Sequence, residues 1–197
     1  MQHIPEKPAP TDLPLIEPIK QRWSPVIFSA EPIDLKTIAT LFEACRWAPS
    51  SYNEQPWRYI YATKDDGERR AKLESLLVDG NAWAKDAYLL LISFASKAFA
   101  KNAKPNPHAM HDLGTASGFL TLQAVSMGLL THQMSGFYAD KANETLGVPA
   151  DFVPGSMMAV GYPGDLANAK PDMKERDAGP RQRNEQQAWV FHGKWME

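Results

Sequence analysis

The sequence has few or none of the features that would indicate a disulfide, a metal site, a nucleotide-binding motif or a strongly charged surface. A single cysteine, Cys45, allows neither an intrachain disulfide nor a cysteine zinc cluster. There is no Gly-x-Gly-x-x-Gly and no Walker motif, which argues against a dinucleotide-binding Rossmann unit. The net charge is only -2, so bulk electrostatics give no basis for binding nucleic acid or an anionic membrane.

Long hydrophobic segments are also scarce. The first residues, MQHIPEKPAPTDLP, contain no apolar run of the kind found in secretory signals, so we expect a cytoplasmic protein. Residues 113–134 contain no charged side chain, but glycine, serine, threonine and glutamine interrupt them, which argues against a membrane span. We predict instead that 111–130 form a helix buried on nearly all sides, in the core and in a large subunit interface.

The chain length and composition fit one globular domain. Of 197 residues, 44% are hydrophobic, enough for a sizeable core. Residues 1–19 contain five prolines and are predicted to form an extended arm, followed by a single domain over 20–197.

Local patterns predict both helices and strands. Asp34 is a candidate N-cap for a helix that ends before Pro49. We predict an α+β sandwich in which helices flank a mixed or antiparallel sheet, with 111–130 as the long buried central helix. The other expected elements are strands at 57–63, 88–95 and 156–165, helices at 65–77 and 141–149, a loop at 166–180 and an edge strand in the C-terminal tail.

Three polar clusters are candidates for binding a ligand. They are QRWSPV (21–26), PSSYNEQPW (49–57) and PRQR (180–183). Arginine forks match phosphate oxygens and a serine hydroxyl can donate to the same group, so the first and third could form a phosphate pocket. Taken singly, the arginines are also typical of a solvated surface, and Pro, Ser and Asn are ordinary turn residues.

The order of the motifs extends this interpretation. RWSP, EACRWAPSSYNEQPWRYIYATKDD, GNAWAKDA, DLGTASGFLTLQAVSMGLLTHQMSGF, LGVP, VGYPGD and RQRNEQQAWVFHGKW occur in the same order as in the FMN-dependent nitroreductase family, which the chain resembles over about residues 20–195. The resemblance implies a nitroreductase-like FMN-binding domain and an intimate homodimer. It also implies two FMN molecules at the interface, each contacted by both subunits.

The resemblance further implies which residues hold FMN. Arg22 and Ser24 match the Arg-x-Ser that binds the phosphate, and Arg181 and Arg183 match a basic pair that closes the same site. The other matched positions are Asn81 at the flavin ring, Ser135 and Gly136 beside flavin N5, and Pro49, Ser50, Ser51 and Asn53, which reach the flavin of the partner subunit.

Two positions depart from the family pattern. Ser135 stands where many members have glutamate, and Val26 stands where many have a basic residue near flavin N1 and O2. A nearby cation favours an anionic group, so its loss predicts a more negative midpoint potential unless His132 or Lys85 takes its place.

No amino-acid nucleophile or metal is expected in the reaction, because FMN carries out the redox chemistry. Cys45 lies on an apolar helix face and is expected to behave as a small, unreactive apolar side chain. His108 and His111 are three residues apart but lack further ligands, so no metal site is expected. We assign no catalytic residue.

The sequence thus predicts an FMN-dependent oxidoreductase that uses NAD(P)H to reduce a small electrophile, such as a nitroaromatic or quinone, by a ping-pong mechanism. Other reactions on the same scaffold remain open: dehalogenation, enone reduction and dehydrogenation. So does a flavin-binding or storage protein with little turnover.

Overall fold

The sheet of the computed structural model, which describes residues 6–195, is antiparallel throughout. Its strands are β1 (Trp57–Thr63), β2 (Leu89–Ser96), β3 (Leu130–Met134) and β4 (Phe152–Gly161), in the spatial order β1-β2-β4-β3. Each neighbouring pair runs antiparallel. The predicted α+β class is confirmed.

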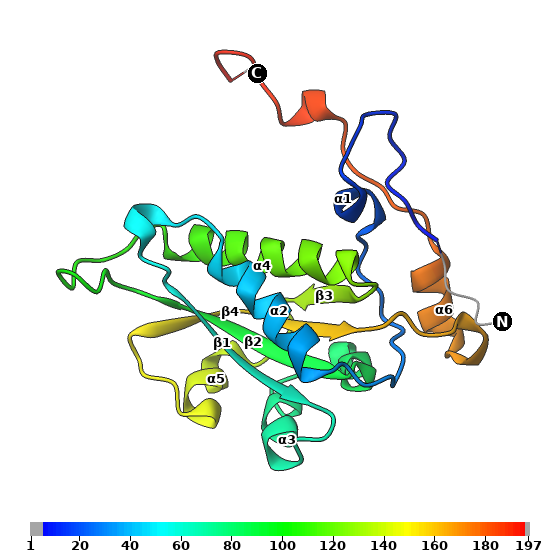
Figure 1. Cartoon of the computed structure of the whole chain (residues 1–197), viewed down its shortest axis with the longest axis horizontal. Coiled ribbons are helices and arrows are strands. Elements are labelled where there is room, and N and C mark those ends of the chain that lie inside the picture. The colour runs from blue at the N-terminus through cyan, green and yellow to red at the C-terminus, as the bar shows by residue number, and fades with distance from the viewer. Residues whose placement is uncertain (1–5, 196–197) are drawn as a thin grey trace.

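Helices cover both faces of the sheet. In Figure 1, α2 (Leu35–Arg46) and α4 (Ala109–Ser126) lie on one side, and α3 (Glu68–Glu74) and α5 (Ala139–Leu146) lie on the other. Along β2, Leu89 and Leu91 belong to the core beneath α2 and α4, whereas Leu90 and Ile92 belong to the opposite core. The continuous apolar run of β2 therefore reflects burial on both faces.

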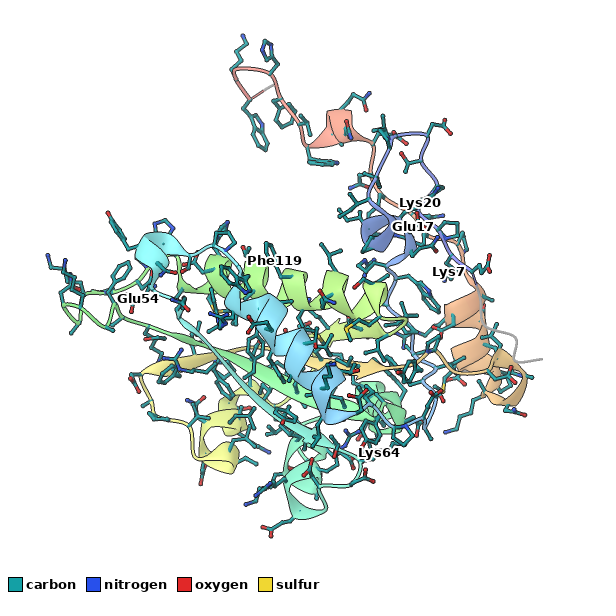
Figure 2. All side chains as sticks on the ribbon, in the orientation of Figure 1. Lys7, Glu17, Lys20, Glu54, Lys64 and Phe119 are labelled. Carbon is teal, nitrogen blue, oxygen red and sulfur yellow. The ribbon has the colours of Figure 1, made fainter. Side chains whose placement is uncertain are left out.

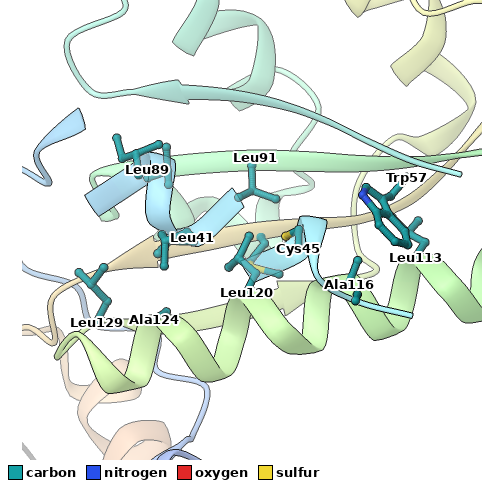
Figure 3. Packing of buried hydrophobic residues seen from close by; sticks show 14 of the residues in the cluster. Leu41, Cys45, Trp57, Leu89, Leu91, Leu113, Ala116, Leu120, Ala124 and Leu129 are labelled. Atoms are coloured by element: carbon teal, nitrogen blue, oxygen red, sulfur yellow. The ribbon is translucent and has the colours of Figure 1, made fainter. Parts of the chain in front are cut away.

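The first core is built where α2 and α4 meet the sheet. Figure 3 shows Leu41 and Cys45 of α2 facing Leu120 and Ala116 of α4 over Leu91. The Asp34 carboxylate accepts a 2.9 Å hydrogen bond from the Thr37 N–H, which confirms the predicted N-cap of α2.

The uncharged segment differs from its prediction in two ways. Helix α4 ends at Ser126, Gly128 has a φ of 76°, and β3 follows at Leu130, where a helix was expected. Only one face of α4 is buried in the single chain, and its outer face exposes residues such as Gly114 and Phe119. Burial on nearly all sides is thus wrong for one chain. Within residues 6–195, no helix is long and apolar enough to cross a membrane.

The N-terminal arm and the C-terminal tail both project from the sheet and the helices that cover it (Figure 1). The arm ends in α1 (Glu17–Gln21), and the predicted loop at 166–180 contains the helix α6 (Pro171–Ala178), so that prediction was wrong in part. The described part of the tail, which extends to Trp195, contains no strand, so the edge-strand prediction was also wrong. Residues 1–5 of the predicted arm lie outside the described residues. Figure 1 shows the arm and the tail projecting side by side beyond α4.

Candidate functional site

Three arginines from opposite ends of the sequence form a basic cluster. Arg22 follows α1, and its Nη1 donates a 3.1 Å hydrogen bond to Ser24 Oγ. Burial lowers the pKa of Arg22, and the charges of Arg181 and Arg183 lower it further. None of the three pairs with a carboxylate in residues 6–195. Like charges held together without a counterion form a site suited to an anion with several oxygens.

Arg181 also connects the segment after α6 to the N-terminal segment. Its Nη1 donates hydrogen bonds of 2.7 Å to the carbonyl oxygens of Lys7 and Lys20. Together with Arg183 it lines a cleft of about 900 Å³ between the N-terminal arm and the tail. The basic cluster therefore forms only when both ends of the chain are in place.

A second predicted group assembles where β3 ends. The Asn81 side-chain amide, in the 3-10 segment η2 (Asp79–Asp86), donates a 2.8 Å hydrogen bond to the Gly136 carbonyl oxygen. A Cβ at position 136 would lie 2.7 Å from Asn81 Nδ2, so a larger residue here would displace the Asn81 side chain. Ser135 is exposed beside it, and no described residue bonds the Asn81 amide oxygen. The group can offer hydrogen-bonding atoms to a flat heterocycle.

One hydrogen bond connects these two groups. His132 Nδ1 lies 2.7 Å from the carbonyl oxygen of Pro25, which follows Ser24 directly. His132 lies in β3, and Ser135 follows the last residue of that strand. The arginine cluster and the Asn81–Gly136 group are thus linked through Pro25, His132 and the end of β3.

The Pro49–Asn53 loop is strained and firmly anchored. Tyr52, Asn53 and Gln55 have φ values of 53°, 55° and 49°, in the left-handed region that non-glycine residues rarely adopt. The Ser51 N–H donates to the buried carboxylate of Asp112 at 3.0 Å, and the Gln55 N–H donates to Ser50 Oγ at 3.0 Å. Tyr52 is 93% exposed. Pro49 is exposed as well. Strain held by surrounding bonds in an exposed loop is typical of a binding segment.

This loop lies far from the arginine cluster within one chain. Asp112, which anchors it, is in the first turn of α4, whereas Pro18 of α1 lines a groove with Gln123 and Ser126 near the other end. At about 1.5 Å of rise per residue, Asp112 and Ser126 are roughly 20 Å apart. Figure 2 shows the same separation, with Glu54 at one end of the molecule and Lys7 and Lys20 at the other. The structure therefore does not bring all the predicted residues together.

The structure shows where Val26 lies and whether Lys85 or His132 could replace the positive charge that many family members have at this position. Val26 is buried, 1% exposed, and its N–H donates to the Asp177 carboxylate. Lys85 is exposed. His132 lies between the two binding groups, but burial lowers its pKa, and the charges of Arg176 and Arg22 lower it further. His132 is thus uncharged at neutral pH in the chain as it stands.

The structure also places the cysteine and the two histidines that the sequence raised as other reactive or metal-binding candidates. Cys45 is buried, and burial raises the pKa of its thiol to about 11. His108 and His111 lie at the start of α4, where His111 Nδ1 contacts Asp112 at 3.3 Å. No group of three or more His, Cys, Asp or Glu side chains within 6–195 could hold a metal ion. Sequence reasoning assigned no role to Asp112 or Tyr52, although both fall within quoted motifs, because the contact between Asp112 and Ser51 and the exposure of Tyr52 depend on tertiary structure.

The described residues fit a cofactor that has a phosphate and a flat polar ring. The three arginines, which have no carboxylate partner among residues 6–195, suit the phosphate together with Ser24. Asn81, held by its hydrogen bond to Gly136, suits the ring.

Known proteins resemble this chain closely. The model of the nitroreductase family matches residues 19–162. A solved structure of an FMN-containing oxidoreductase is 32% identical, with a TM-score of 0.88 over 94% of this chain and 95% of that one. An uncharacterized 15.4 kDa protein of Mycolicibacterium smegmatis is 35% identical over 62% of this chain and 82% of its own length. An NADH dehydrogenase of Thermus thermophilus is 24% identical over 70% and 81%.

Proposed function

Because the chain belongs to the nitroreductase family and is an FMN-dependent oxidoreductase, we propose that it reduces small electrophiles with NAD(P)H in a site shared by two subunits. The observation that carries the proposal is the separation of the Ser51 loop from the arginine cluster by about the length of α4. One chain offers the two halves of a cofactor site at opposite ends. Two copies related by a twofold axis would complete two sites.

In the proposed site, Arg22, Ser24, Arg181 and Arg183 hold the FMN phosphate. The proximity of the three guanidinium groups supports this assignment, since none of them has a carboxylate partner in the described chain. Asn81, Ser135 and Gly136 would hold the ring, and the bond from Asn81 to Gly136 fixes the distance between η2 and the end of β3. Pro49, Ser50, Ser51 and Asn53 would close the site of the other subunit.

FMN supplies the electron and hydride chemistry when bound, so the chain itself binds, orients and shields. The proposed donor is NADH or NADPH. The relationship to a protein named NADH dehydrogenase supports a nicotinamide donor, but no motif in the sequence selects between the two. The proposed acceptor is a planar nitroaromatic or quinone, which would occupy the same space after the nicotinamide leaves, as a ping-pong mechanism requires.

The homodimer is supported by apolar surface that the single chain leaves uncovered. A groove of about 530 Å³ on the outer side of α2 and α4 is lined by Trp47, Phe119 and Leu122, with Trp47 70% exposed. The projecting arm and tail expose Leu13, Ile16 and Trp189. Exposed apolar side chains on the α2–α4 groove, the arm and the tail support an interface. We also propose a cytoplasmic location, since the only cysteine is a buried free thiol and the donor is a nicotinamide.

Anaerobic stopped-flow spectroscopy tests the activity. The purified holoenzyme is mixed with NADH or NADPH, then with a quinone or a nitroaromatic compound. Rapid bleaching of the visible flavin band, followed by its return with the acceptor, is the expected result. A flavin that stays oxidised with both nicotinamides would favour the alternative of a binding or storage protein. Bleaching with recovery only by a haloarene, or only by an enone, would favour the corresponding other reaction.

A further inference from the structure

His132 has one ring nitrogen engaged and one free. The Pro25 carbonyl oxygen, 2.7 Å from Nδ1, can only accept a hydrogen bond, so Nδ1 carries the proton. In the neutral ring, Nε2 is then an unprotonated acceptor. No described residue forms a hydrogen bond with Nε2. The backbone thus fixes the tautomer and leaves one basic nitrogen available.

Aromatic side chains shield the ring on one side. The Trp83 ring lies 4.5 Å from the His132 ring, and Phe28 stacks on Trp83 at 6.3 Å with an interplanar angle of 12°. The Trp83 Nε1 donor is itself buried without a partner among the described residues. His132 is therefore held in place by packing as well as by Pro25.

The two charged groups that act on the pKa of His132 are both arginines. Burial lowers its pKa most, followed by the charges of Arg176 in α6 and Arg22, while the hydrogen bond to Pro25 acts in the opposite direction. Asp177, the buried carboxylate of α6, accepts hydrogen bonds from the N–H groups of Val26 and Ile27. The residue paired with His132 on β4 is Ala159, which is uncharged. The surroundings of the ring therefore favour its neutral form.

We propose that His132 Nε2 lies against the bound FMN, between its phosphate and its ring, and takes up one proton when the flavin is reduced. The inference rests on the proposed function, since it uses the same site. Its basis is position: Pro25 follows the predicted phosphate ligand Ser24, and Ser135 with Gly136 follows His132 on the same strand end.

The charge balance gives the reason for proton uptake. Transfer of a hydride breaks a C–H bond of the reduced nicotinamide and brings two electrons with one proton, so the site gains one net negative charge. A negative charge a few ångströms away favours the protonated form of a base. The proton bound by Nε2 comes from water, and it passes to the acceptor when the acceptor takes the two electrons. His132 would thus store the second proton that a two-electron reduction of a quinone requires.

Two measurements on the FMN-loaded protein test this role. In the first, the His132 ring is titrated by NMR in the oxidised and in the dithionite-reduced holoenzyme. The titration midpoint should move to higher pH on reduction. In the second, the midpoint potential is measured against pH for wild type, His132→Gln and the control His108→Gln, which changes an exposed histidine at the far end of α4. Wild type and the control should bind one more proton per two electrons than His132→Gln over part of the pH range.

The results separate this inference from the proposed function. A protein that binds FMN and is reduced by NAD(P)H, yet shows the same His132 midpoint in both redox states, would overturn the role of His132 alone. Identical pH profiles of the potential for wild type and His132→Gln would do the same. A protein without FMN, or with an FMN that nicotinamides do not reduce, would instead contradict the proposed function.

Discussion

The N–H of Ser51 donates a 3.0 Å hydrogen bond to the carboxylate of Asp112, which joins the strained loop to the first turn of α4. Asp112 is buried, 4% exposed, and α4 also forms the uncharged outer face. The element that would carry the subunit interface therefore also positions the loop that would cross it.

Replacing Asp112 with alanine should loosen this loop. Loss of a hydrogen bond to a charged group typically costs about 1.5–3 kcal/mol. In the wild type, part of this free energy holds the loop in its observed conformation. We expect Asp112→Ala to bind FMN roughly tenfold more weakly while it still folds. Titration of the apoprotein with FMN, followed by fluorescence quenching, measures this affinity. The control is His108→Ala, which changes an exposed side chain at the start of α4. Equal affinity of the two variants would contradict the anchoring role.

The basic cluster gives a second prediction. Arg22→Ala or Arg183→Ala should each remove a charge-assisted phosphate bond worth about 1.5–3 kcal/mol. FMN should then bind roughly 10–100-fold more weakly, whereas riboflavin, which lacks the phosphate, should bind both variants and wild type alike. Arg69→Ala, on the exposed side of α3, is the matched control. Wild-type FMN affinity in both cluster variants would show that the phosphate lies elsewhere.

Val26 offers a test of burial against electrostatics. The sequence alone suggested that Val26→Arg would raise the flavin midpoint potential. The side chain is buried, however, and Asp177 already bonds its N–H, so an arginine here would bury a charge. We expect a destabilisation of about 4 kcal/mol or more, seen as a large fall in the melting temperature, and a smaller fall for Val26→Ala. A stable Val26→Arg protein with a raised potential would show that position 26 opens to the cofactor.

Cys45 should be unreactive in the folded protein. Burial raises the pKa of its thiol to about 11, above its ordinary value, so the reactive thiolate is scarce at neutral and mildly alkaline pH. Labelling with a thiol reagent at pH 8 should be slow in the native protein and fast in denaturant, because unfolding restores both the exposure and the ordinary pKa. Rapid labelling without loss of flavin would argue that the core around Leu41 and Leu120 opens readily.

Strong periodicity and capping were readable from the sequence. Asp34, followed by apolar residues at helical spacing, predicted α2, and the unbroken apolar run of β2 predicted a strand covered on both faces. Helix α6 was missed because PDMKERDA has almost no apolar face, although Pro171 at its first turn is a start signal. Strand β3 was missed because the apolar character of α4 continues through Leu130, while Gly128 alone marks the break.

The residues of the site could be predicted from the sequence, but their contacts could not. The family resemblance pointed to Arg22 and Asn81 and assigned the loop with Asn53 to the partner subunit's flavin, whereas the separation of about the length of α4 within one chain is visible only in the structure. The anchoring carboxylate of Asp112 and the fixed tautomer of His132 depend on contacts between residues far apart in the chain. Such contacts follow from tertiary packing and leave no local pattern.

Subunit complementation tests the shared site most directly. One variant, Arg22→Ala/Arg183→Ala, loses the phosphate half, and the other, Ser51→Ala/Asn53→Gly, loses the loop half while glycine keeps the left-handed backbone at position 53. Each variant alone should bind FMN weakly. After the two are unfolded and refolded together, every mixed dimer should contain one intact site and one doubly defective site, so tight FMN binding should return. If both halves of a site came from the same chain, mixing would restore no tight binding, and that result would contradict the account.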